Sequence, residues 1–272
     1  MDPGRGRATV SSGFPTTRAP ADAGTVAAVL GLPGSIRACL FDLDGVLTRT
    51  ATVHMAAWKR TFDEFLRRTD PGAGEFTQAD YNRFVDGKPR LDGVRDFLAS
   101  RGITLPEGTP DDPPEAATVH GVGLRKNQLV HAQLAEHGVE VYPGSVRYLR
   151  AAREAGLATA VVTASRNGAQ VIEAGGFADL IDTRVDGEVA AAQGLRGKPA
   201  PDTFLAGARA LGVPPAAAVV FEDALAGVAA GRAGDFGYVV GVDRVGQADA
   251  LAASGADVVV QDLAELLDGE AS

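Results

Sequence analysis

Short apolar runs that end in polar or acidic residues recur along this chain, and they restrict its possible folds more than any other feature. The first run covers residues 36–41 and leads directly into Asp42, Leu43 and Asp44. Similar runs cover 158–162, 218–221, 238–242 and 257–260. Uninterrupted apolar runs of this length are typical of strands that are buried on both faces of a parallel sheet.

The segments between these runs have the apolar spacing of amphipathic helices, which we expect over 145–154, 168–174, 201–211 and 225–233. Strands that alternate with helices predict an α/β protein with a Rossmann-like parallel sheet and helices on both faces. Ligands in such sheets bind beyond the carboxyl ends of the strands. Those are the ends at which this chain carries its polar residues.

A different pattern separates the first run from the second. Four helices are expected there, over 54–68, 78–86, 93–100 and 123–136, together with a loop rich in proline and aspartate at 106–114. We therefore predict an α-helical cap domain over 51–139, inserted into a catalytic core that comprises 35–50 and 140–272. Residues 1–34 are rich in small and polar side chains, and we expect a disordered tail with one short helix at 25–32.

The charge balance of the chain limits its partners. It has 26 basic and 35 acidic residues and a formal net charge of -9, which argues against a general nucleic-acid binder. No apolar run approaches the length of a membrane span, and the N-terminal part lacks the apolar core of a secretory signal. The single cysteine, Cys39, allows no internal disulfide and is expected to be buried in a strand. We expect a cytoplasmic protein that acts as a monomer, without nucleic-acid or membrane partners.

Asp42 and Asp44 lie two residues apart at the end of the first run, so both can face the same side of an extended chain. Two carboxylates that share a buried site repel each other and lose hydration, and both stay ionised only when a cation balances them. Mg²⁺ prefers oxygen ligands and suits such a pair. A solvated turn is the alternative, and the apolar residues on both sides disfavour it.

The segment 41–47, Phe-Asp-Leu-Asp-Gly-Val-Leu, resembles the first signature of the haloacid dehalogenase superfamily. Three further segments resemble the other signatures in the right order: Val161-Val162-Thr163, Lys198-Pro199-Ala200-Pro201-Asp202 and Phe221-Glu222-Asp223-Ala224. The resemblance spans the chain from residue 36 to about residue 267. It implies the α/β core predicted above and an enzyme that transfers phosphoryl groups.

The resemblance also implies roles for these residues. Asp42 would attack phosphorus and become an aspartyl phosphate, and Asp44 would be the general acid/base. Thr163 would bind the transferring phosphoryl group, and Lys198 would neutralise its charge. The implied Mg²⁺ ligands are Asp42, the carbonyl of Asp44, and the acidic pair Glu222 and Asp223. The ordinary alternatives are a surface lysine before a proline for Lys198, and a helix N-terminus favoured by acidic residues for the pair.

The position of the insert resembles that of the superfamily's helical-cap class, and within that class the chain is most similar to the beta-phosphoglucomutases. In that pattern Thr50 is a hinge threonine and His54 a substrate-responsive histidine, and both control the general acid/base. Arg90 matches a cap arginine that holds the distal phosphate, and Lys126 matches a cap lysine that contacts the sugar. The core segment Ser165-Arg166-Asn167 matches a loop that binds the non-transferring phosphate.

This branch of the family implies conversion of beta-D-glucose 1-phosphate to glucose 6-phosphate through the 1,6-bisphosphate. The cap residues have alternatives: Arg90 and Lys126 as solvated helix-end cations, and His54 as a core or surface histidine. Trp58, one helical turn after His54, is expected to be a packing residue. The cap loop at 106–114 is longer and more acidic than the family pattern, and it could alter the choice of sugar.

Rival functions use the same core. A sugar-phosphate phosphatase would let water attack the aspartyl phosphate, and nothing in the core motifs excludes it. A phosphonate hydrolase would need a Schiff-base lysine in the cap, and a haloacid dehalogenase would not need Asp44. A non-catalytic module would normally have lost a carboxylate or the lysine, and this chain keeps all of them.

Overall fold

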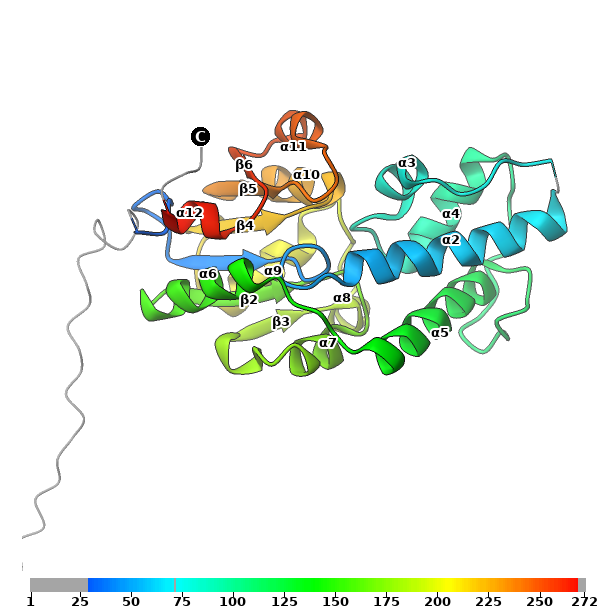
Figure 1. Ribbon diagram of the computed structural model, residues 1–272, viewed down its shortest axis with the longest axis horizontal. Helices are drawn as coiled ribbons and strands as arrows, with labels where there is room; N and C mark the ends of the chain where they lie inside the picture. Colours follow the sequence, from blue (N-terminus) through cyan, green and yellow to red (C-terminus); the bar gives the residue numbers. More distant parts are fainter. Residues whose placement is uncertain (1–28, 71, 269–272) are drawn as a thin grey trace, which may run out of the picture.

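The computed structural model describes residues 29–70 and 72–268, and most of the predicted tail and its short helix lie outside these residues. Six parallel strands form one sheet in the order β3-β2-β1-β4-β5-β6 (Figure 1). Their bounds are β1 Ala38–Phe41, β2 Ala158–Val162, β3 Thr183–Val185, β4 Ala218–Glu222, β5 Tyr238–Val242 and β6 Val258–Val260. Strands β2 and β3 lie on one side of β1, and β4, β5 and β6 lie on the other, so the order of the strands switches between β1 and β4. Sheets of this kind bind ligands at that switch point.

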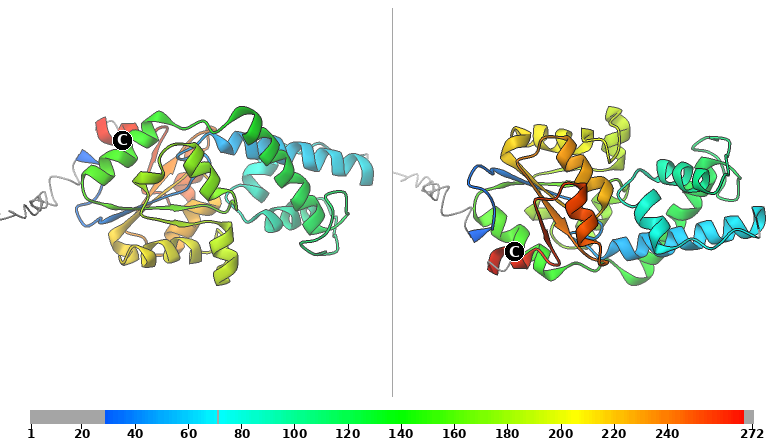
Figure 2. Two further views of the ribbon diagram at one scale, coloured as in Figure 1. Left: turned by 90° about the horizontal axis from the view of Figure 1, so that it is seen from below. Right: turned by 90° about the horizontal axis from the view of Figure 1, so that it is seen from above.

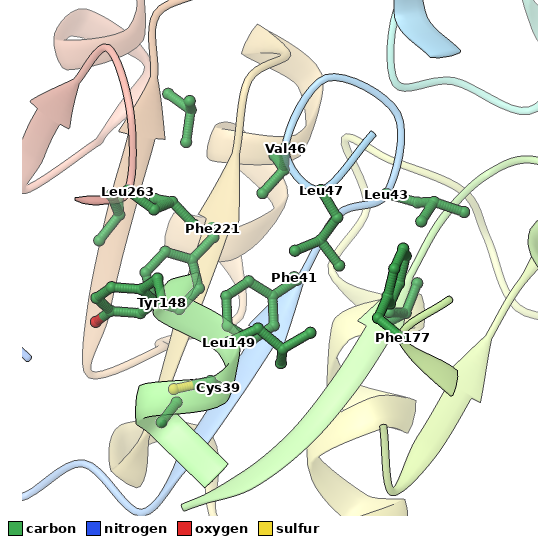
Figure 3. Packing of buried hydrophobic residues seen from close by; sticks show 14 of the residues in the cluster. Cys39, Phe41, Leu43, Val46, Leu47, Tyr148, Leu149, Phe177, Phe221 and Leu263 are labelled. Atoms are coloured by element: carbon green, nitrogen blue, oxygen red, sulfur yellow. The ribbon is translucent and has the colours of Figure 1, made fainter. Parts of the chain in front are cut away.

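Alternate residues of the central strands pack into two separate cores. Cys39 and Phe41 of β1 belong to the core on one face, and Ala38 and Leu40 belong to the core on the other. Phe41 stacks on Phe221 of β4 (Figure 3), and their ring centroids are 4.5 Å apart. All of these side chains are fully buried, so the strand pattern has the two-sided burial expected of a parallel sheet.

Helices cover both faces of the sheet (Figure 2). On the face of Phe41 lie α6 (Pro143–Glu154), α7 (Gly168–Ala174) and α12 (Ala264–Asp268). On the other face lie α8 (Gly187–Gln193), α9 (Asp202–Ala210), α10 (Leu225–Ala233) and α11 (Ala248–Ser254). Short 3₁₀ turns precede β3 (η2, Ala178–Leu180) and β4 (η3, Pro215–Ala217).

A helical unit stands beyond the carboxyl ends of the strands, at the right of Figure 1. It consists of α2 (Thr50–Thr69), α3 (Gln78–Asp80), the π-helix η1 (Tyr81–Val85), α4 (Arg90–Ser100) and α5 (Val119–His137). Its own core is rich in aromatic residues, with Phe62 fully buried between Trp58, Phe76 and Phe97. We call this unit the cap; its domain boundaries at 51 and 139 stay a prediction.

The two connections between cap and core run side by side. The amide of Arg49 donates to the carbonyl of Glu140 at 2.8 Å, and the amide of Tyr142 donates to the carbonyl of Leu47 at 2.9 Å. The guanidinium of Arg244 stacks on the Tyr142 ring, 3.6 Å from its centroid, and donates to the carbonyl of Gly45. The hinge is therefore a short two-stranded ribbon that is fastened to the loop after β1.

The sequence-based description misses or misplaces several elements. It contains no counterpart of β3, α8, α11 or α12. The expected helix over 78–86 is one turn of α3 followed by the π-helix η1, and three cap helices begin three to four residues earlier than predicted, at Thr50, Arg90 and Val119. The first strand begins at Ala38 rather than at Ile36. Within the described residues no helix is long and apolar enough to cross a bilayer.

Candidate active site

Two neighbouring strands place the acidic residues of the site at one point. Asp42 directly follows β1, Glu222 ends β4 and Asp223 follows it. Because β1 pairs with β4 in parallel register, Phe41 beside Phe221, these three carboxylates converge. One oxygen from each lies within 4.8 Å of the others, and all three side chains are buried. The sheet thus gathers residues from two distant signatures at the switch point.

Lys198 enters this cluster from the segment before α9. Its Nζ donates to Asp42 Oδ1 at 2.5 Å, to Glu222 Oε1 at 2.5 Å and to the carbonyl of Val162 at 3.1 Å. The lysine is only 3% exposed, so it is not the solvated surface residue that the alternative proposed. Its ammonium also lies 4.8 Å from the ring centroid of Phe204. All of its donors have partners, and these hydrogen bonds hold the ammonium against Asp42.

The charges in this cluster do not balance. Burial raises the pKa of the Asp42 carboxyl well above its usual range, an effect that Lys198 opposes and that Glu222 and Asp44 strengthen. Burial also raises the pKa of Asp223, with further contributions from Asp86 and Glu222. Burial alone would lower the pKa of Lys198, but its two carboxylate partners outweigh burial and raise it. One ammonium cannot neutralise this group of carboxylates, so the site has room for a further cation or a proton.

The donor set fits Mg²⁺. Carboxylate and carbonyl oxygens are the ligands of a hard divalent cation. Among the described residues none donates a hydrogen bond to the Asp223 carboxylate, and Asp42 has one oxygen left beside the one that binds Lys198. Glu222 is less available, because its oxygens accept from Lys198 and from the amide of Ala224. Asp42 and Asp223 are therefore the side chains that would hold the ion, with Glu222 orienting Lys198.

Asp44 lies at the mouth of the site and is held from both domains. The hydroxyls of Thr50 and Thr163 donate to its two carboxylate oxygens, the latter at 3.0 Å. His54 Nε2 lies 3.5 Å from Oδ1. Thr50 and His54 are four residues apart in the first turns of α2, so both face the same carboxylate. The side chain of Asp44 is thus within reach of the hinge, the cap and the core.

His54 is joined to Lys126 of α5, with 2.7 Å between Nδ1 and Nζ. Burial lowers the pKa of His54 to about 4, with a further contribution from Lys126. Burial also lowers the pKa of Lys126 to about 7, and Arg90 adds to that effect while Asp44 opposes it. Lys126 is 4% exposed and lies over the ring of Trp58, so it is a buried cap residue and not a solvated cation.

A cavity of about 820 Å³ lies between cap and core. It is bounded by residues from both, and its lining includes Asp42, Asp44, Asp86, Asp223, His54, Trp58, Arg90, Lys126, Asn127, Thr163, Ser165, Arg166 and Lys198. Pro110 of the cap loop also lines it, so that loop does form part of the wall. The packing role predicted for Trp58 agrees with its stacking on Phe62 at 4.9 Å between centroids, although its ring also borders the cavity.

Arg90 and Arg166 form a second positive region in the cavity. Burial lowers the pKa of Arg90 to about 10, and the neighbouring charge of Arg166 contributes. The Nε atom of Arg90 is buried and has no hydrogen-bond partner among the described residues. Asn127 and Ser165 line the same cavity: the side chain of Asn167 donates to Asn127 at 3.5 Å, and its backbone amide donates to the Ser165 hydroxyl at 3.2 Å. Two like charges side by side, one with an unpaired donor, indicate a site for an anion.

All the residues predicted for the site therefore lie in or directly beside this cavity. Sequence reasoning missed Asp86, whose pKa is raised to about 7 by burial and by the charge of Glu222. It also missed Thr48, which lies 2.6 Å from the Thr50 hydroxyl and donates to the carbonyl of Leu43. The signal for Asp86 is its place in the sequence, four residues before Arg90.

Gly45 provides a test of the local geometry. Its φ is +99°, and a Cβ atom at this position would lie 1.8 Å from Asp223 Oδ2. We expect Gly45→Ala to displace Asp223 and to lower the catalytic rate about 100-fold, because misplacing a reacting group by about 1 Å has an effect of that size. Steady-state rates over a range of Mg²⁺ concentrations measure it.

The control for Gly45→Ala is Gly156→Ala. Gly156 also has a positive φ of +82°, but no atom lies within 4 Å of the Cβ that alanine would add. This variant is expected to lose about 1 kcal/mol of unfolding free energy from backbone strain alone and to keep its activity. Equal activity losses in both variants would contradict the role given to the Asp223 contact.

Comparisons with known proteins agree with this geometry. The model of the haloacid dehalogenase-like hydrolase family matches residues 36–235. A beta-phosphoglucomutase of Mycobacterium bovis is 54% identical over 247 residues, which cover 88% of this chain and 94% of that protein. A beta-phosphoglucomutase of Bacillus subtilis is 29% identical and covers 85% of this chain and 92% of its own length.

A solved structure supports the fold. The crystal structure of a beta-phosphoglucomutase from Clostridium difficile has a TM-score of 0.69 and 24% identity, and the match covers 85% of this chain and 93% of that one. The sheet, the converging acidic residues and the family model thus point the same way. The chain belongs to the haloacid dehalogenase-like hydrolase family and, within it, to the beta-phosphoglucomutase-like branch.

Proposed function

We propose that this protein is a Mg²⁺-dependent beta-phosphoglucomutase that converts beta-D-glucose 1-phosphate to glucose 6-phosphate through an aspartyl phosphate on Asp42. The observation that carries the proposal is the second positive region: Arg90 Nε is buried beside the guanidinium of Arg166 and has no hydrogen-bond partner in the part of the chain that the structure describes. A bisphosphate intermediate needs two anion sites, and the cavity lining includes Lys198 and, separately, Arg90 with Arg166, which supports one site at each. A simple phosphatase needs only the first.

In the first half of the reaction Asp42 carries the phosphoryl group. Asp44 takes the proton from the sugar 6-hydroxyl while that oxygen attacks phosphorus, and the bond between phosphorus and the Asp42 oxygen breaks. The ammonium of Lys198 neutralises charge on the equatorial oxygens, and the hydroxyl of Thr163 donates to them. The products of this step are the 1,6-bisphosphate, the free Asp42 carboxylate and a protonated Asp44.

In the second half the bisphosphate is bound in the opposite orientation. Asp42 attacks the phosphorus of the 1-phosphate, and the C1 oxygen leaves with the proton of Asp44, which gives glucose 6-phosphate and restores the aspartyl phosphate. Arg90, Arg166 and Lys126 hold the phosphate and sugar that are not reacting. A Mg²⁺ ion held by Asp42, the Asp44 carbonyl and Asp223, with Glu222 nearby, would supply charge neutralisation for the transfer.

One assay tests the function. Purified protein receives Mg²⁺, beta-glucose 1-phosphate and a trace of the 1,6-bisphosphate, and glucose 6-phosphate and free phosphate are measured in the same sample. We expect rapid isomerisation with little phosphate release. Stoichiometric phosphate release without isomerisation would instead identify a sugar-phosphate phosphatase.

Replacing Arg90 tests the second anion site. Arg90→Ala is expected to lower kcat/KM for isomerisation about 10- to 100-fold, the value of hydrogen bonds between charged groups, and to raise phosphate release per turnover. Arg67→Ala, at an exposed position near the end of α2, is the matched control and should leave both rates unchanged. An unchanged rate of isomerisation in Arg90→Ala would show that the distal phosphate does not bind at Arg90.

The proposed function also bears on the oligomeric state and the location of the protein. We propose that the monomer is the active unit. A phosphorylated sugar and free Mg²⁺ are ordinary constituents of the cytoplasm, where we propose that the protein acts.

A further inference from the structure

Three further contacts join the cap to loops of the core. A Cβ atom on Gly87 would lie 2.9 Å from the Ala224 methyl, and one on Gly197 would lie 2.0 Å from Pro89. Gly197 immediately precedes Lys198, and Ala224 immediately follows Asp223. The third contact is a hydrogen bond from Asn82 Nδ2 to Gln247 Oε1 at 3.1 Å. The first two are packing contacts, whereas the third is a hydrogen bond with a defined donor and acceptor.

Side-chain amides form a continuous chain through this third contact. Gln78 Nε2 donates to Asn82 Oδ1 at 2.7 Å, and Asn82 in turn donates to Gln247. Gln247 Nε2 then donates to the backbone carbonyl of Asp223 at 3.0 Å. Asn82 and Gln247 each accept through the side-chain oxygen and donate through the side-chain nitrogen in the direction of Asp223. Hydrogen bonds in such chains polarise one another and act as a unit.

The backbone around Gln247 and around Asn82 is held in place by local hydrogen bonds. Gln247 follows a turn in which Asp243 Oδ1 accepts from the amides of Gly246 and Gln247, each at 2.8 Å. Asn82 lies in the π-helix η1, which ends where the amide of Asp86 donates to the carbonyl of Tyr81. Extra residues in a helical turn of this kind are frequent at functional sites. The orientation of the Gln247 amide therefore depends on whether the cap is in contact with the core.

We propose that Gln247 is a positioning residue that couples closure of the cap to the placement of Asp223. With the cap closed, Asn82 holds the Gln247 oxygen, and the Gln247 nitrogen then faces the Asp223 carbonyl. When the cap moves away, the amide loses its orienting partner and the loop after β4 loses a hydrogen bond next to the Mg²⁺ ligand. The site is then complete only while the cavity is closed to water, which favours transfer to a sugar hydroxyl over transfer to water.

This inference rests on the proposed Mg²⁺ role of Asp223 but not on the identity of the sugar. Its test is amide hydrogen exchange over residues 223–228, measured without Mg²⁺ and without sugar, in wild type, Asn82→Ala and Gln247→Glu. Asn82→Ala removes only the cap partner. Gln247→Glu can still accept from Asn82 but cannot donate to the Asp223 carbonyl. We expect exchange to rise about fivefold in each variant, the value of one neutral hydrogen bond.

The double variant and the control sharpen the result. The two changes should be non-additive, because either one breaks the same chain. Gln133→Ala, on the exposed face of α5, should leave exchange over 223–228 unchanged. With Mg²⁺ and substrate added, Asn82→Ala is expected to lower kcat about fivefold with little change in KM. Asn82→Ala with wild-type exchange over 223–228 would overturn the coupling, whatever reaction the enzyme performs.

Discussion

Replacing Asp42 with asparagine is expected to lower the rate of phosphoryl transfer by about 10⁴-fold or more. The amide is nearly the same size as the carboxylate but is a poor nucleophile, so no aspartyl phosphate forms. It also carries no charge to hold the Lys198 ammonium, which lies 2.5 Å from Asp42 Oδ1. Both isomerisation and the phosphorylated protein, detected by mass spectrometry, should disappear together.

The control for this variant separates chemistry from folding. Asp179→Asn changes an exposed carboxylate of the turn before β3 and should retain full activity. Because Asp42→Asn removes a buried negative charge from a cluster that has too many, the variant should unfold at a temperature no lower than wild type. Retention of full rate by Asp42→Asn would exclude Asp42 as the nucleophile.

Replacing Lys198 with methionine is expected to lower both the rate of phosphoryl transfer and the free energy of unfolding. Lys198 is the only ammonium among the described residues that contacts Asp42 and Glu222, which are 5% and 0% exposed. Its removal leaves buried carboxylates without their partner, which typically costs about 3–5 kcal/mol. The rate should fall about 10³-fold, since a charge that stabilises the transferring group is lost.

The stability of Lys198→Met should depend on pH in a defined direction. Burial already raises the pKa of Asp42, and without Lys198 nothing opposes that shift. A carboxyl whose pKa is higher in the folded than in the unfolded state binds more protons when folded. The variant's free energy of unfolding should therefore be largest at acid pH and fall as pH rises from the unfolded value through the raised folded one. Urea denaturation at a series of pH values measures this.

Lys59→Met is the matched control. Its ammonium contacts Asp63 and Glu75 on the cap surface with a side chain that is 41% exposed, so its loss should cost about 1 kcal/mol or less. If Lys198→Met loses equally little free energy of unfolding, or if that loss does not vary with pH, the charge of the buried carboxylates is balanced by a group other than this lysine.

Much of the core could be predicted because parallel strands impose a simple rule. The residues that follow β1 and β4 must meet, since the strands pair in register and run the same way. Asp42 and Asp223 could thus be placed together from the two apolar runs that precede them. Lys198 could be placed only through its resemblance to a signature, since it lies on a connection and not at a strand end.

The edge elements escaped prediction for physical reasons. β3 has three residues, Thr183–Val185, and only Val185 is buried, so it lacks the apolar run that marks a central strand. Helix α11 buries only Leu251, and α12 has only five residues, so neither has a clear apolar period. The π-helix η1 has the sequence pattern of an ordinary helix, because side-chain spacing does not distinguish hydrogen bonds to the fifth residue from those to the fourth.

The contacts between residues distant in the sequence could not be derived from local pattern at all. His54 and Lys126 are 72 residues apart, and Asn82 and Gln247 are 165 residues apart. Their pairing depends on how the cap folds and how it rests on the core, which no short-range spacing records. Amide side chains add to the difficulty, because asparagine and glutamine are common on surfaces and carry no charge that marks a site.

The hinge ribbon has a consequence for how such enzymes can be rebuilt. The chain leaves the core at Arg49 and re-enters it at Glu140, and those two residues share a backbone hydrogen bond of 2.8 Å. The two ends of the segment between them are therefore adjacent in space. A tight hairpin turn could replace that segment and connect the two parts of the core at little entropic cost. We therefore expect that helical inserts of other lengths and shapes could be joined at the same junction, which would give the sheet a different substrate cavity without a change in any strand.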